Sequence, residues 1–312
     1  MYLRHMPNIF LFVQRMSMRI ETGHYLMLHG GSNKASKTSA KHIGDGLKMD
    51  PRNRDACVDL YDNDQNPLPS VGQNHGTKCA GVAVASKNSI CAIGSAFEAR
   101  YAAIRMIGPF GVTQSAKLQA ILRAGVDVSS NSWGGLDGTF DGPSANEQNA
   151  FIKGSKLRGG KGVIYVFAGG NGGFDDNCNL DGYVNSIYTI GINGVARDRE
   201  PPGYAEPCSA ILASAYTGKG GSSDNVCTTD VNGGCISSFT GTSAAAPLAA
   251  GALALVLESK RWLLNYHNHT NSNNIANTIR NCIIKNISYV EYNTEKRSKK
   301  KLKLNASELI GD

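Results

Sequence analysis

Three short segments of the chain carry residue types that together could perform nucleophilic catalysis. His75 lies in an Asn-His-Gly-Thr segment, Asn171 in a glycine-rich turn at 168–173, and Ser243 in a Gly-Thr-Ser-Ala-Ala-Ala-Pro segment. A serine attacks a carbonyl carbon efficiently when a nearby histidine accepts its proton and hydrogen-bond donors stabilise the oxyanion that forms. The sequence therefore nominates Ser243 as nucleophile, His75 as base and Asn171 as oxyanion donor.

Each of these residues also has a simpler structural interpretation. Ser243 precedes the apolar stretch 248–257 and could serve only as the N-cap of a buried helix. A single histidine such as His75 is more often structural than catalytic. The small residues around both positions favour the catalytic interpretation, because they leave room for another chain to approach. We expect Pro247 in the first turn of the helix, where its missing N–H costs nothing.

The elements that must position these residues alternate between strand and helix types. Alternation of this kind predicts βαβ units, a parallel sheet and an α/β fold. Two of the strands end in glycine-rich turns, one at Ser132-Trp133-Gly134 and one at Asn171, and sites of open parallel sheets lie at such strand ends. Neither turn matches a phosphate-binding motif. The predicted strands are 101–107, 126–133, 163–168 and 187–192, and the predicted helices are 115–124 and 146–157.

Length and composition indicate an ordinary globular protein. The 312 residues are 41% hydrophobic and 18% charged, which excludes collagen, a coiled coil and disorder throughout. The net charge is +7, but residues 50–258 hold 15 Lys and Arg against 19 Asp and Glu, so the excess lies in the flanks. The basic run 296–303 could bind nucleic acid or an anionic membrane, and we interpret it instead as a solvated tail. No nucleic-acid partner is expected.

The flanking segments show no sign of a compact domain. We assign residues 1–49 to an atypical N-terminal segment, 50–264 to the α/β domain and 265–312 to a disordered tail rich in Asn and Lys. No run approaches the ~18 apolar residues of a membrane helix, and the short apolar run 9–13 is not a convincing signal peptide. Eight cysteines without a CxxC pair make a zinc site improbable. Asn-x-Ser/Thr sequons begin at Asn268, Asn286 and Asn305.

The three segments around His75, Asn171 and Ser243 resemble the His, oxyanion-Asn and Ser boxes of subtilisin-like serine proteases, in that family's order. Segments 176–189, 132–134 and 141–143 are similar to signatures of the furin and kexin branch, the proprotein convertases. The resemblance covers about residues 55–260. It implies a three-layer subtilisin-like fold with a mainly parallel central sheet, whose N-terminal part is incomplete here. It also implies a calcium-dependent endopeptidase of the secretory pathway, in the Golgi or outside the cell, that cleaves precursor proteins after Arg or Lys.

The same resemblance assigns the cysteines. It pairs Cys91 with Cys235 and Cys178 with Cys208, and it leaves Cys79 unpaired beside His75. Cys57, Cys227 and Cys282 receive no partner from the resemblance, and one further pair among these three stays open.

The resemblance also implies a substrate cleft and two calcium sites. Asp181 corresponds to an acid of the S1 pocket and Asp141 to an acid lining the cleft, beside Ser132, Trp133 and Gly134. Carboxylates are the usual partners of an arginine side chain. One calcium site would be formed by Asp137, Asp176 and Glu206, since calcium prefers oxygen ligands. A second would lie around Ala85, Asn88 and Ile90, mainly on backbone oxygens.

The chain departs from the family pattern at several positions. The family's catalytic Asp lies well before the His box and follows an apolar strand in an Asp-Asp-Gly turn. The only Asp-Gly pair in that region here, at Asp45, follows a polar segment. Asp45 is therefore a poor candidate for the third catalytic group. A prodomain, a following β-sandwich domain and a membrane anchor are not recognisable, so we expect a fragment of a larger protein. Residues after Arg105 where the family has acids are Gly108, Gln114 and Lys117, and Gly72 and Gln73 precede the His box.

These departures leave three hypotheses. The first is an active convertase, with preference for a single basic residue retained and preference for a basic pair weakened. The second is a pseudoprotease that binds basic peptides without cleaving them, because the catalytic Asp is missing. The third is a nucleic-acid-binding protein, which rests on the lysine run alone. The His, Asn and Ser boxes favour the first.

Overall fold

A computed structural model of the chain describes residues 25–29, 57–65, 67, 72–89, 91–221, 224–231 and 234–267. Asp45, Ile90, Cys282, the three sequons and the basic run 296–303 lie outside the described residues. Within the described part of the chain, no helix is long and apolar enough to cross a membrane.

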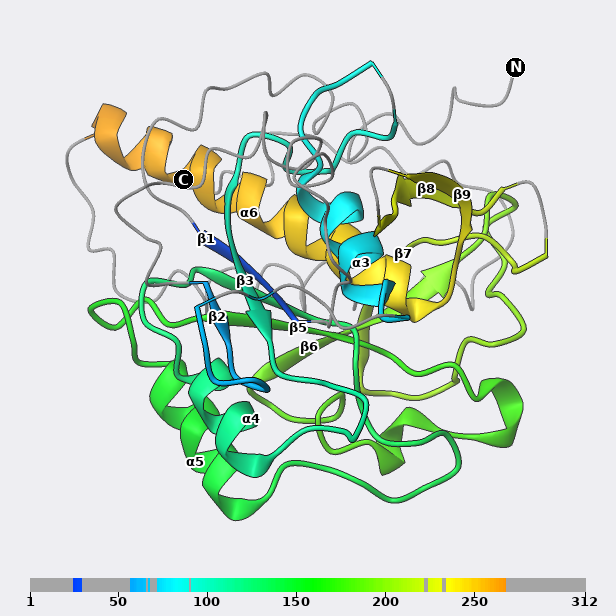
Figure 1. Cartoon of the computed structure of the whole chain (residues 1–312), viewed down its shortest axis with the longest axis horizontal. Coiled ribbons are helices and arrows are strands. Elements are labelled where there is room, and N and C mark those ends of the chain that lie inside the picture. Colours follow the sequence, from blue (N-terminus) through cyan, green and yellow to red (C-terminus); the bar gives the residue numbers. More distant parts are fainter. Residues whose placement is uncertain are drawn as a thin grey trace, which may run out of the picture.

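A central sheet of seven parallel strands runs through the molecule in the order β2-β3-β1-β4-β5-β6-β7 (Figure 1). This arrangement confirms the predicted α/β fold with a mainly parallel sheet. The strands are β1 Tyr25–His29, β2 Val58–Asp59, β3 Arg100–Arg105, β4 Val128–Asn131, β5 Ile164–Ala168, β6 Thr189–Val195 and β7 Ile211–Tyr216. A separate antiparallel hairpin contains β8 Val226–Thr229 and β9 Cys235–Phe239.

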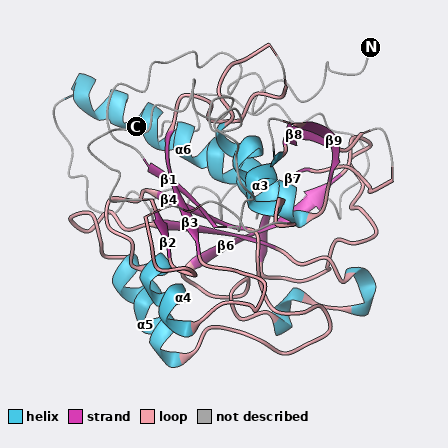
Figure 2. Ribbon diagram, viewed as in Figure 1, coloured by secondary structure: helices cyan, strands magenta, loops and turns pink. Residues whose placement is uncertain are grey.

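Helices cover both faces of the sheet and make three layers (Figure 2). On one face, α3 and α6 pack over a core that includes Val84, Ala250 and Ile192. On the other face, α4 and α5 enclose a core that includes Phe151 and Tyr165. Burial on both faces explains why β4 is buried along its whole length, as is usual for parallel strands. The helices are α3 His75–Val84, α4 Gln114–Ile121, α5 Ala145–Gly154 and α6 Thr242–His267, with short 3-10 helices η2 Gly173–Asp175 and η3 Cys178–Leu180.

Strand β1 comes from the N-terminal segment to which the sequence assigned no element. It lies in the middle of the sheet, between β3 and β4, and it pairs in parallel with both. Its last residue, His29, is in register with Ile104 on one side and with Asn131 on the other. The end of β1 therefore lies at the same edge of the sheet as the turn that begins at Ser132.

We expected Pro247 in the first turn of this helix. Helix α6 begins at Thr242, so Pro247 lies in the second turn instead. A proline there cannot donate to the carbonyl four residues earlier, which belongs to Ser243. That carbonyl oxygen instead accepts hydrogen bonds from the hydroxyl of Ser132, at 3.0 Å, and from the thiol of Cys79, at 3.5 Å. The proline thus frees an acceptor that joins α6 to the end of β4 and to α3.

Candidate active site

Helices α3 and α6 bring His75 and Ser243 together. His75 opens α3, and Cys79 follows it by one helical turn. The Sγ atom of Cys79 lies 3.8 Å from Nδ1 of His75 and 3.5 Å from the carbonyl oxygen of Ser243. Burial raises the pKa of Cys79 to about 12, so this thiol stays neutral and can donate. Cys79 therefore connects two residues that are far apart in the sequence.

The surroundings of His75 suit a base more than an acid. Burial, followed by the nearby charge of Lys78, lowers the pKa of His75 below its ordinary value. The ring also packs edge-on against Phe239, with 5.7 Å between the ring centroids. His75 is consequently neutral at physiological pH and can accept a proton. No hydrogen bond joins His75 to Ser243, and no carboxylate among the described residues is hydrogen-bonded to His75.

Thr242 fixes the orientation of the Asn171 side chain. The backbone N–H of Thr242 donates to Oδ1 of Asn171 at 2.9 Å, and the Thr242 hydroxyl lies 3.0 Å from the same oxygen. With its oxygen held in this way, the Asn171 amide keeps its two N–H groups as donors toward the cleft that both Asn171 and Ser243 line. Sequence reasoning gave Thr242 no role, although its position immediately before Ser243 was a usable signal.

A cleft beside Ser243 contains the other residues that the sequence nominated for substrate contact. Its lining includes Ser132, Trp133, Gly134, Asp141, Asn171 and Asp181. The backbones of Asp141 and Asp181 meet in an isolated parallel bridge, which holds the two acids next to each other. A Cβ atom on Gly134 would lie 2.7 Å from Oδ2 of Asp181, so a side chain at position 134 would displace this carboxylate from its present position.

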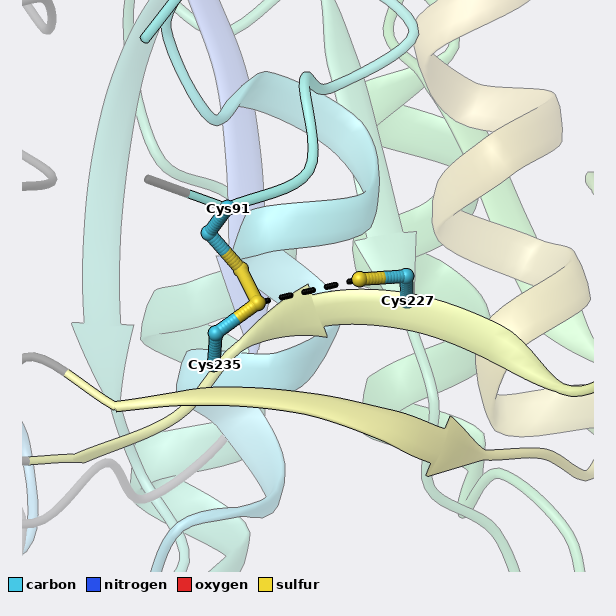
Figure 3. A group of neighbouring side chains, drawn as sticks. All are labelled: Cys91, Cys227 and Cys235. Carbon is cyan, nitrogen blue, oxygen red and sulfur yellow. Dashed lines mark hydrogen bonds between the residues drawn. A yellow bond between two sulfur atoms is a disulfide. The ribbon is translucent and has the colours of Figure 1, made fainter. Parts of the chain in front are cut away.

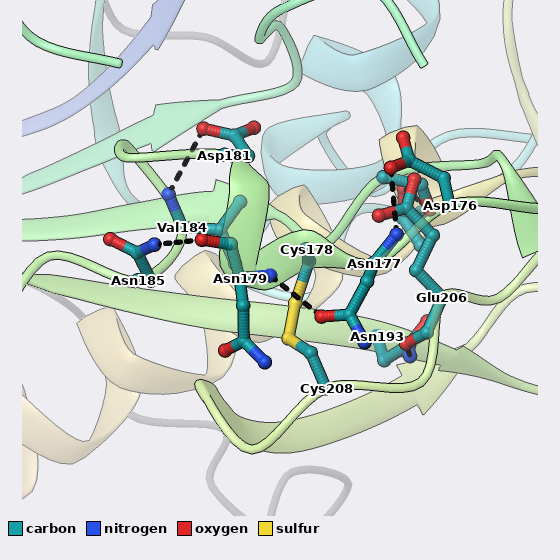
Figure 4. The surroundings of a disulfide bond; sticks show 12 residues. Asp176, Asn177, Cys178, Asn179, Asp181, Val184, Asn185, Asn193, Glu206 and Cys208 are labelled. Carbon is teal, nitrogen blue, oxygen red and sulfur yellow. Dashed lines mark hydrogen bonds between the residues drawn. A yellow bond between two sulfur atoms is a disulfide. The ribbon is translucent and has the colours of Figure 1, made fainter. Parts of the chain in front are cut away.

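Asp181 is held in a setting that favours a cationic partner. Its Oδ1 accepts the backbone N–H group of Tyr183 at 2.8 Å. It also accepts the backbone N–H group of Val184 at 3.3 Å (Figure 4). Burial nevertheless raises the pKa of Asp181, and the charges of Asp141 and Asp176 add to this effect while the backbone bonds oppose it. A positively charged side chain in the cleft would relieve this repulsion.

Three carboxylates gather behind the Asn171 turn. Oxygen atoms of Asp137, Asp176 and Glu206 all lie within 4.8 Å of one another. Glu206 is only 3% exposed and accepts the backbone N–H of Gly172 at 2.9 Å. Burial raises the pKa of Glu206 to about 7, and the neighbouring acids contribute to this rise. Such a cluster of carboxylate oxygens fits a hard divalent cation such as Ca²⁺.

The glycine turn is shaped by this acidic cluster. Gly170 has φ +95°, a conformation that favours glycine, and a Cβ atom there would lie 2.1 Å from Glu206. Gly172 would meet Asp176 at 2.4 Å in the same way. The turn that presents Asn171 to the cleft therefore rests directly on Asp176 and Glu206.

The loop after α3, where the sequence suggested a second calcium site, is closed by Asn88. The side-chain amide of Asn88 donates to the carbonyl oxygens of Ser86, at 2.7 Å, and Ala92, at 3.1 Å. Its Oδ1 accepts the backbone N–H of Cys91 at 2.7 Å. Asn88 thus braces the loop through its own hydrogen bonds.

Two disulfides stabilise the site, and they join the pairs that the resemblance implied. Cys91 pairs with Cys235 and Cys178 with Cys208, each with 5.6 Å between the Cα atoms. The second disulfide joins the segment of Asp176 and Asp181 to the segment of Glu206 (Figure 4). It therefore fixes the acidic cluster relative to the cleft.

Lys117 lies in α4, at one of the positions where the resembled family has acidic residues and this chain does not. Its ammonium group donates to the hydroxyl of Tyr183 at 2.7 Å, and it lies 4.9 Å from the centre of that ring and 5.5 Å from the centre of the Trp133 ring. Glu147 is 3.7 Å from the same nitrogen. A half-buried positive charge thus lies against the ring of Trp133, which lines the cleft.

Comparison with known proteins gives one family and a set of long relatives. The model of the subtilase family matches residues 37–306. Furin-like protease 1, isoform 1-CRR, of Drosophila melanogaster is 42% identical over 237 residues, which are 71% of this chain and 22% of that protein. Human furin is 41% identical over 218 residues, which are 67% of this chain and 28% of furin. The endoprotease bli of Onchocerca volvulus is 40% identical and covers 75% of this chain and 35% of its own length.

Solved structures support the same fold. The serine protease of Aeromonas sobria superposes with a TM-score of 0.65 at 18% identity, covering 76% of this chain and 48% of that one. A cold-adapted subtilisin-like serine proteinase gives a TM-score of 0.53 at 20% identity, covering 76% and 75% of the two chains. At such identities the likeness concerns the fold alone. The chain spans between about a fifth and about a third of the length of the curated relatives named above.

Proposed function

The chain belongs to the subtilase family, and on that premise we propose that it is the catalytic core of a calcium-dependent serine endopeptidase of the proprotein convertase type. The proposed substrates are precursor proteins, which it cleaves after Arg or Lys. The observation that carries this proposal is that Asn171 and Ser243 line one cleft, while Cys79 contacts both His75 and the Ser243 carbonyl and Thr242 holds the Asn171 amide.

The proposed reaction assigns one step to each group. The hydroxyl of Ser243 attacks the carbonyl carbon of the scissile bond while neutral His75 takes the proton. The amide of Asn171 donates to the oxyanion that develops, in the orientation that Thr242 imposes. His75 then returns the proton to the departing amine, and a water molecule repeats the sequence to release Ser243. No hydrogen bond joins Ser243 to His75 in the structure, and such a bond commonly tightens only with substrate bound.

One observation favours a second candidate function, a peptide-binding pseudoprotease. Among the described residues, no carboxylate is hydrogen-bonded to His75. A carboxylate partner orients the imidazole and stabilises its protonated form, and without one the rate falls by about 10⁴-fold. The cleft and its acids would still bind a basic peptide in such a protein.

Covalent labelling distinguishes the two candidates. We expect a diphenyl phosphonate with an arginine-like side chain to add to Ser243, as mapped by mass spectrometry of digested protein. A phosphonate with a glutamate-like side chain is the matched control and should label far more slowly. Binding of an arginine peptide without any adduct on Ser243 would instead establish the pseudoprotease.

Asp181 is proposed to select the basic side chain, because it is a half-buried carboxylate in the cleft with a raised pKa. In Asp181→Asn, we expect kcat/KM for an arginine peptide to fall by about 10- to 100-fold, the usual worth of a hydrogen bond to a charged group. Peptides with Ala or Leu before the scissile bond should change little. The measurement is initial rates on matched fluorogenic peptides.

The control for Asp181 is Asp175→Asn, which removes the same charge from an exposed position in the adjacent helix η2. Parent-like selectivity is expected for this variant. An equal loss for arginine and leucine peptides in Asp181→Asn would show that Asp181 supports the fold and does not select the substrate.

Lys117 bears on the proposed preference for a second basic residue. Its half-buried ammonium group contacts Tyr183 and the ring of Trp133, and Trp133 lines the cleft. It opposes a second substrate cation in this part of the cleft, since like charges in a partly buried site repel strongly. We therefore propose that recognition of one basic residue persists while recognition of a basic pair is weaker.

Calcium is proposed to bind Asp137, Asp176 and Glu206 and to support the turn that carries Asn171. At a concentration 100 times its Kd, bound calcium adds about 2.7 kcal/mol to the free energy of unfolding. For a domain of this size we expect EGTA to lower Tm by about 5–10 °C. Differential scanning fluorimetry with and without calcium measures this shift.

Asp176→Asn should remove most of the calcium-dependent shift in Tm, whereas Asp175→Asn should keep it, because only Asp176 belongs to the cluster. Identical Tm values of the parent protein with calcium and with EGTA would contradict the proposal.

The two disulfides are compatible with an oxidising compartment, and we propose the secretory pathway, in the Golgi or outside the cell.

A further inference from the structure

Three sulfur atoms from distant parts of the chain form a cluster at the β8–β9 hairpin (Figure 3). Cys91 and Cys235 form the disulfide described above, and Sγ of Cys227 lies 3.7 Å from Sγ of Cys235. All three Sγ atoms lie within 4.8 Å of one another. Cys227 and Cys235 are exposed, whereas Cys57 and Cys79 are buried.

The pairing of the two strands explains this approach. Thr229 lies opposite Cys235, and Cys227 precedes Thr229 by two residues, so it shares a face of the hairpin with Cys235 as a diagonal neighbour. The register then shifts between Val226 and Thr228, which places Cys227 in the irregular part of the ladder. A bulge of this kind re-aims a side chain, and here the side chain is a thiol next to a disulfide.

We propose that Cys91, Cys227 and Cys235 form a thiol–disulfide exchange site. The thiolate of Cys227 attacks Sγ of Cys235, a Cys227–Cys235 bond forms, and the Cys91–Cys235 bond breaks. The electron pair leaves with Cys91, which takes up the proton that Cys227 has lost. The number of disulfides is unchanged, so the step needs no oxidant and no reductant.

The structure allows the Cys227 sulfur to approach the disulfide and offers a hydrogen-bond acceptor to Cys91, the leaving thiol. Exchange requires three sulfurs in a line, and the present distances describe a triangle, so Cys227 must rotate about its Cα–Cβ bond. Its exposed position permits that rotation. The carbonyl oxygen of Thr228 lies 3.3 Å from Sγ of Cys91 and can accept a hydrogen bond from the released thiol.

The two disulfide isomers connect different parts of the molecule. The Cys91–Cys235 bond spans 144 residues and joins the loop after α3, the helix of His75, to β9, the strand that leads to Ser243. The Cys227–Cys235 bond spans 8 residues and stays within the hairpin. A cross-link that closes a long loop restricts the unfolded chain more than one that closes a short loop. The exchanged isomer therefore has a lower Tm and a looser connection between His75 and Ser243.

Disulfide mapping tests this proposal on the full chain. The protein is incubated at pH 8 with a trace of glutathione, quenched with acid, alkylated with N-ethylmaleimide and digested for mass spectrometry. We expect two populations, one with Cys91–Cys235 and alkylated Cys227, the other with Cys227–Cys235 and alkylated Cys91. Their ratio should not change with the ratio of oxidised to reduced glutathione, because the exchange is redox-neutral.

Three variants sharpen the test. Cys91→Ser should form the Cys227–Cys235 bond completely and lose several degrees of Tm, and Cys227→Ser should contain only Cys91–Cys235. Cys57→Ala, which removes a buried thiol elsewhere, should keep both isomers in the parent ratio.

Either of two results overturns the proposal. In the first, every condition yields only the Cys91–Cys235 disulfide, with Cys227 alkylated. In the second, the mapping finds Cys227 in a disulfide with Cys282. If Cys91→Ser does not fold, comparison of the parent with Cys227→Ser still tests the proposal, because only the parent should contain the Cys227–Cys235 isomer. The readout needs no proteolytic activity, so it is independent of the proposed function.

Discussion

In Ser243→Ala we expect Ser-dependent hydrolysis of an arginine peptide to disappear, and the size of the loss reports on the partner of His75. In subtilisin, removal of the nucleophile costs about 2 × 10⁶ in kcat, and removal of the aspartate alone costs about 3 × 10⁴. The two figures imply that a Ser–His pair without a carboxylate retains only about 10² of acceleration that depends on serine. A loss near 10² would thus mean that His75 acts alone, and a loss near 10⁶ that it has a carboxylate partner.

The measurement is single-turnover and steady-state hydrolysis of one fluorogenic peptide by the parent and by Ser243→Ala, with circular dichroism to verify the fold. The matched control is Ser86→Ala, a buried serine whose backbone carbonyl serves the Asn88 loop but which lies outside the cleft. That variant should retain the parent rate. Hydrolysis that persists undiminished in Ser243→Ala would exclude Ser243 as the nucleophile.

His29→Asp is expected to raise the rate by about 10²- to 10⁴-fold. In the family the catalytic aspartate follows an apolar strand, and in this chain β1 is an apolar strand that ends at His29. His29 is in register with Asn131, which precedes Ser132, and the Ser132 hydroxyl contacts the Ser243 carbonyl. In a catalytic triad the aspartate accepts a hydrogen bond from the Nδ1–H group of the histidine and stabilises the imidazolium that forms. The register of β1 places residue 29 at the sheet edge where the Ser132 turn begins, so an aspartate introduced there tests this role.

His29→Asn is the matched control, because it has the shape of aspartate without the charge. It should show no gain, since an amide cannot stabilise the protonated imidazole as a carboxylate does. The gain in His29→Asp should vanish in the double variant with Ser243→Ala. Equal rates for the parent, His29→Asp and His29→Asn, all with intact folds, would show that the end of β1 does not face His75.

The alternation of apolar strands and helices was sufficient to predict the α/β fold, because buried parallel strands are continuous apolar runs that a short window detects. The boundaries of the predicted strands and helices differ from those of the structure by a few residues. Strand β1 was not predicted from the sequence, because its five residues, Tyr-Leu-Met-Leu-His, lie in a segment without any sustained hydrophobic period. Only the pairing with β3 and β4 identifies it as a strand.

Short motifs nominated His75, Asn171 and Ser243, and tertiary geometry supplied the rest. The role of Thr242 depends on an amide orientation that no spacing encodes. The position of Pro247 in the second turn followed from an earlier start of α6 than the apolar stretch suggested. The proximity of Cys227 to the Cys91–Cys235 disulfide arises from strand register, whereas sequence spacing suggested no cysteine cluster.

The central place of β1 has a consequence for the way the chain is synthesised. Residue 29 leaves the ribosome about a hundred residues before residue 131, its partner in β4. At ~5–20 residues per second, β1 waits about 4–15 s for its partner residue 104 in β3 and about 5–20 s for residue 131 in β4. During that interval an apolar strand is available to wrong partners, and non-local parallel pairing is slow in any case. We therefore expect a holding factor that shields the N-terminal segment during translation to raise the yield of folded protein.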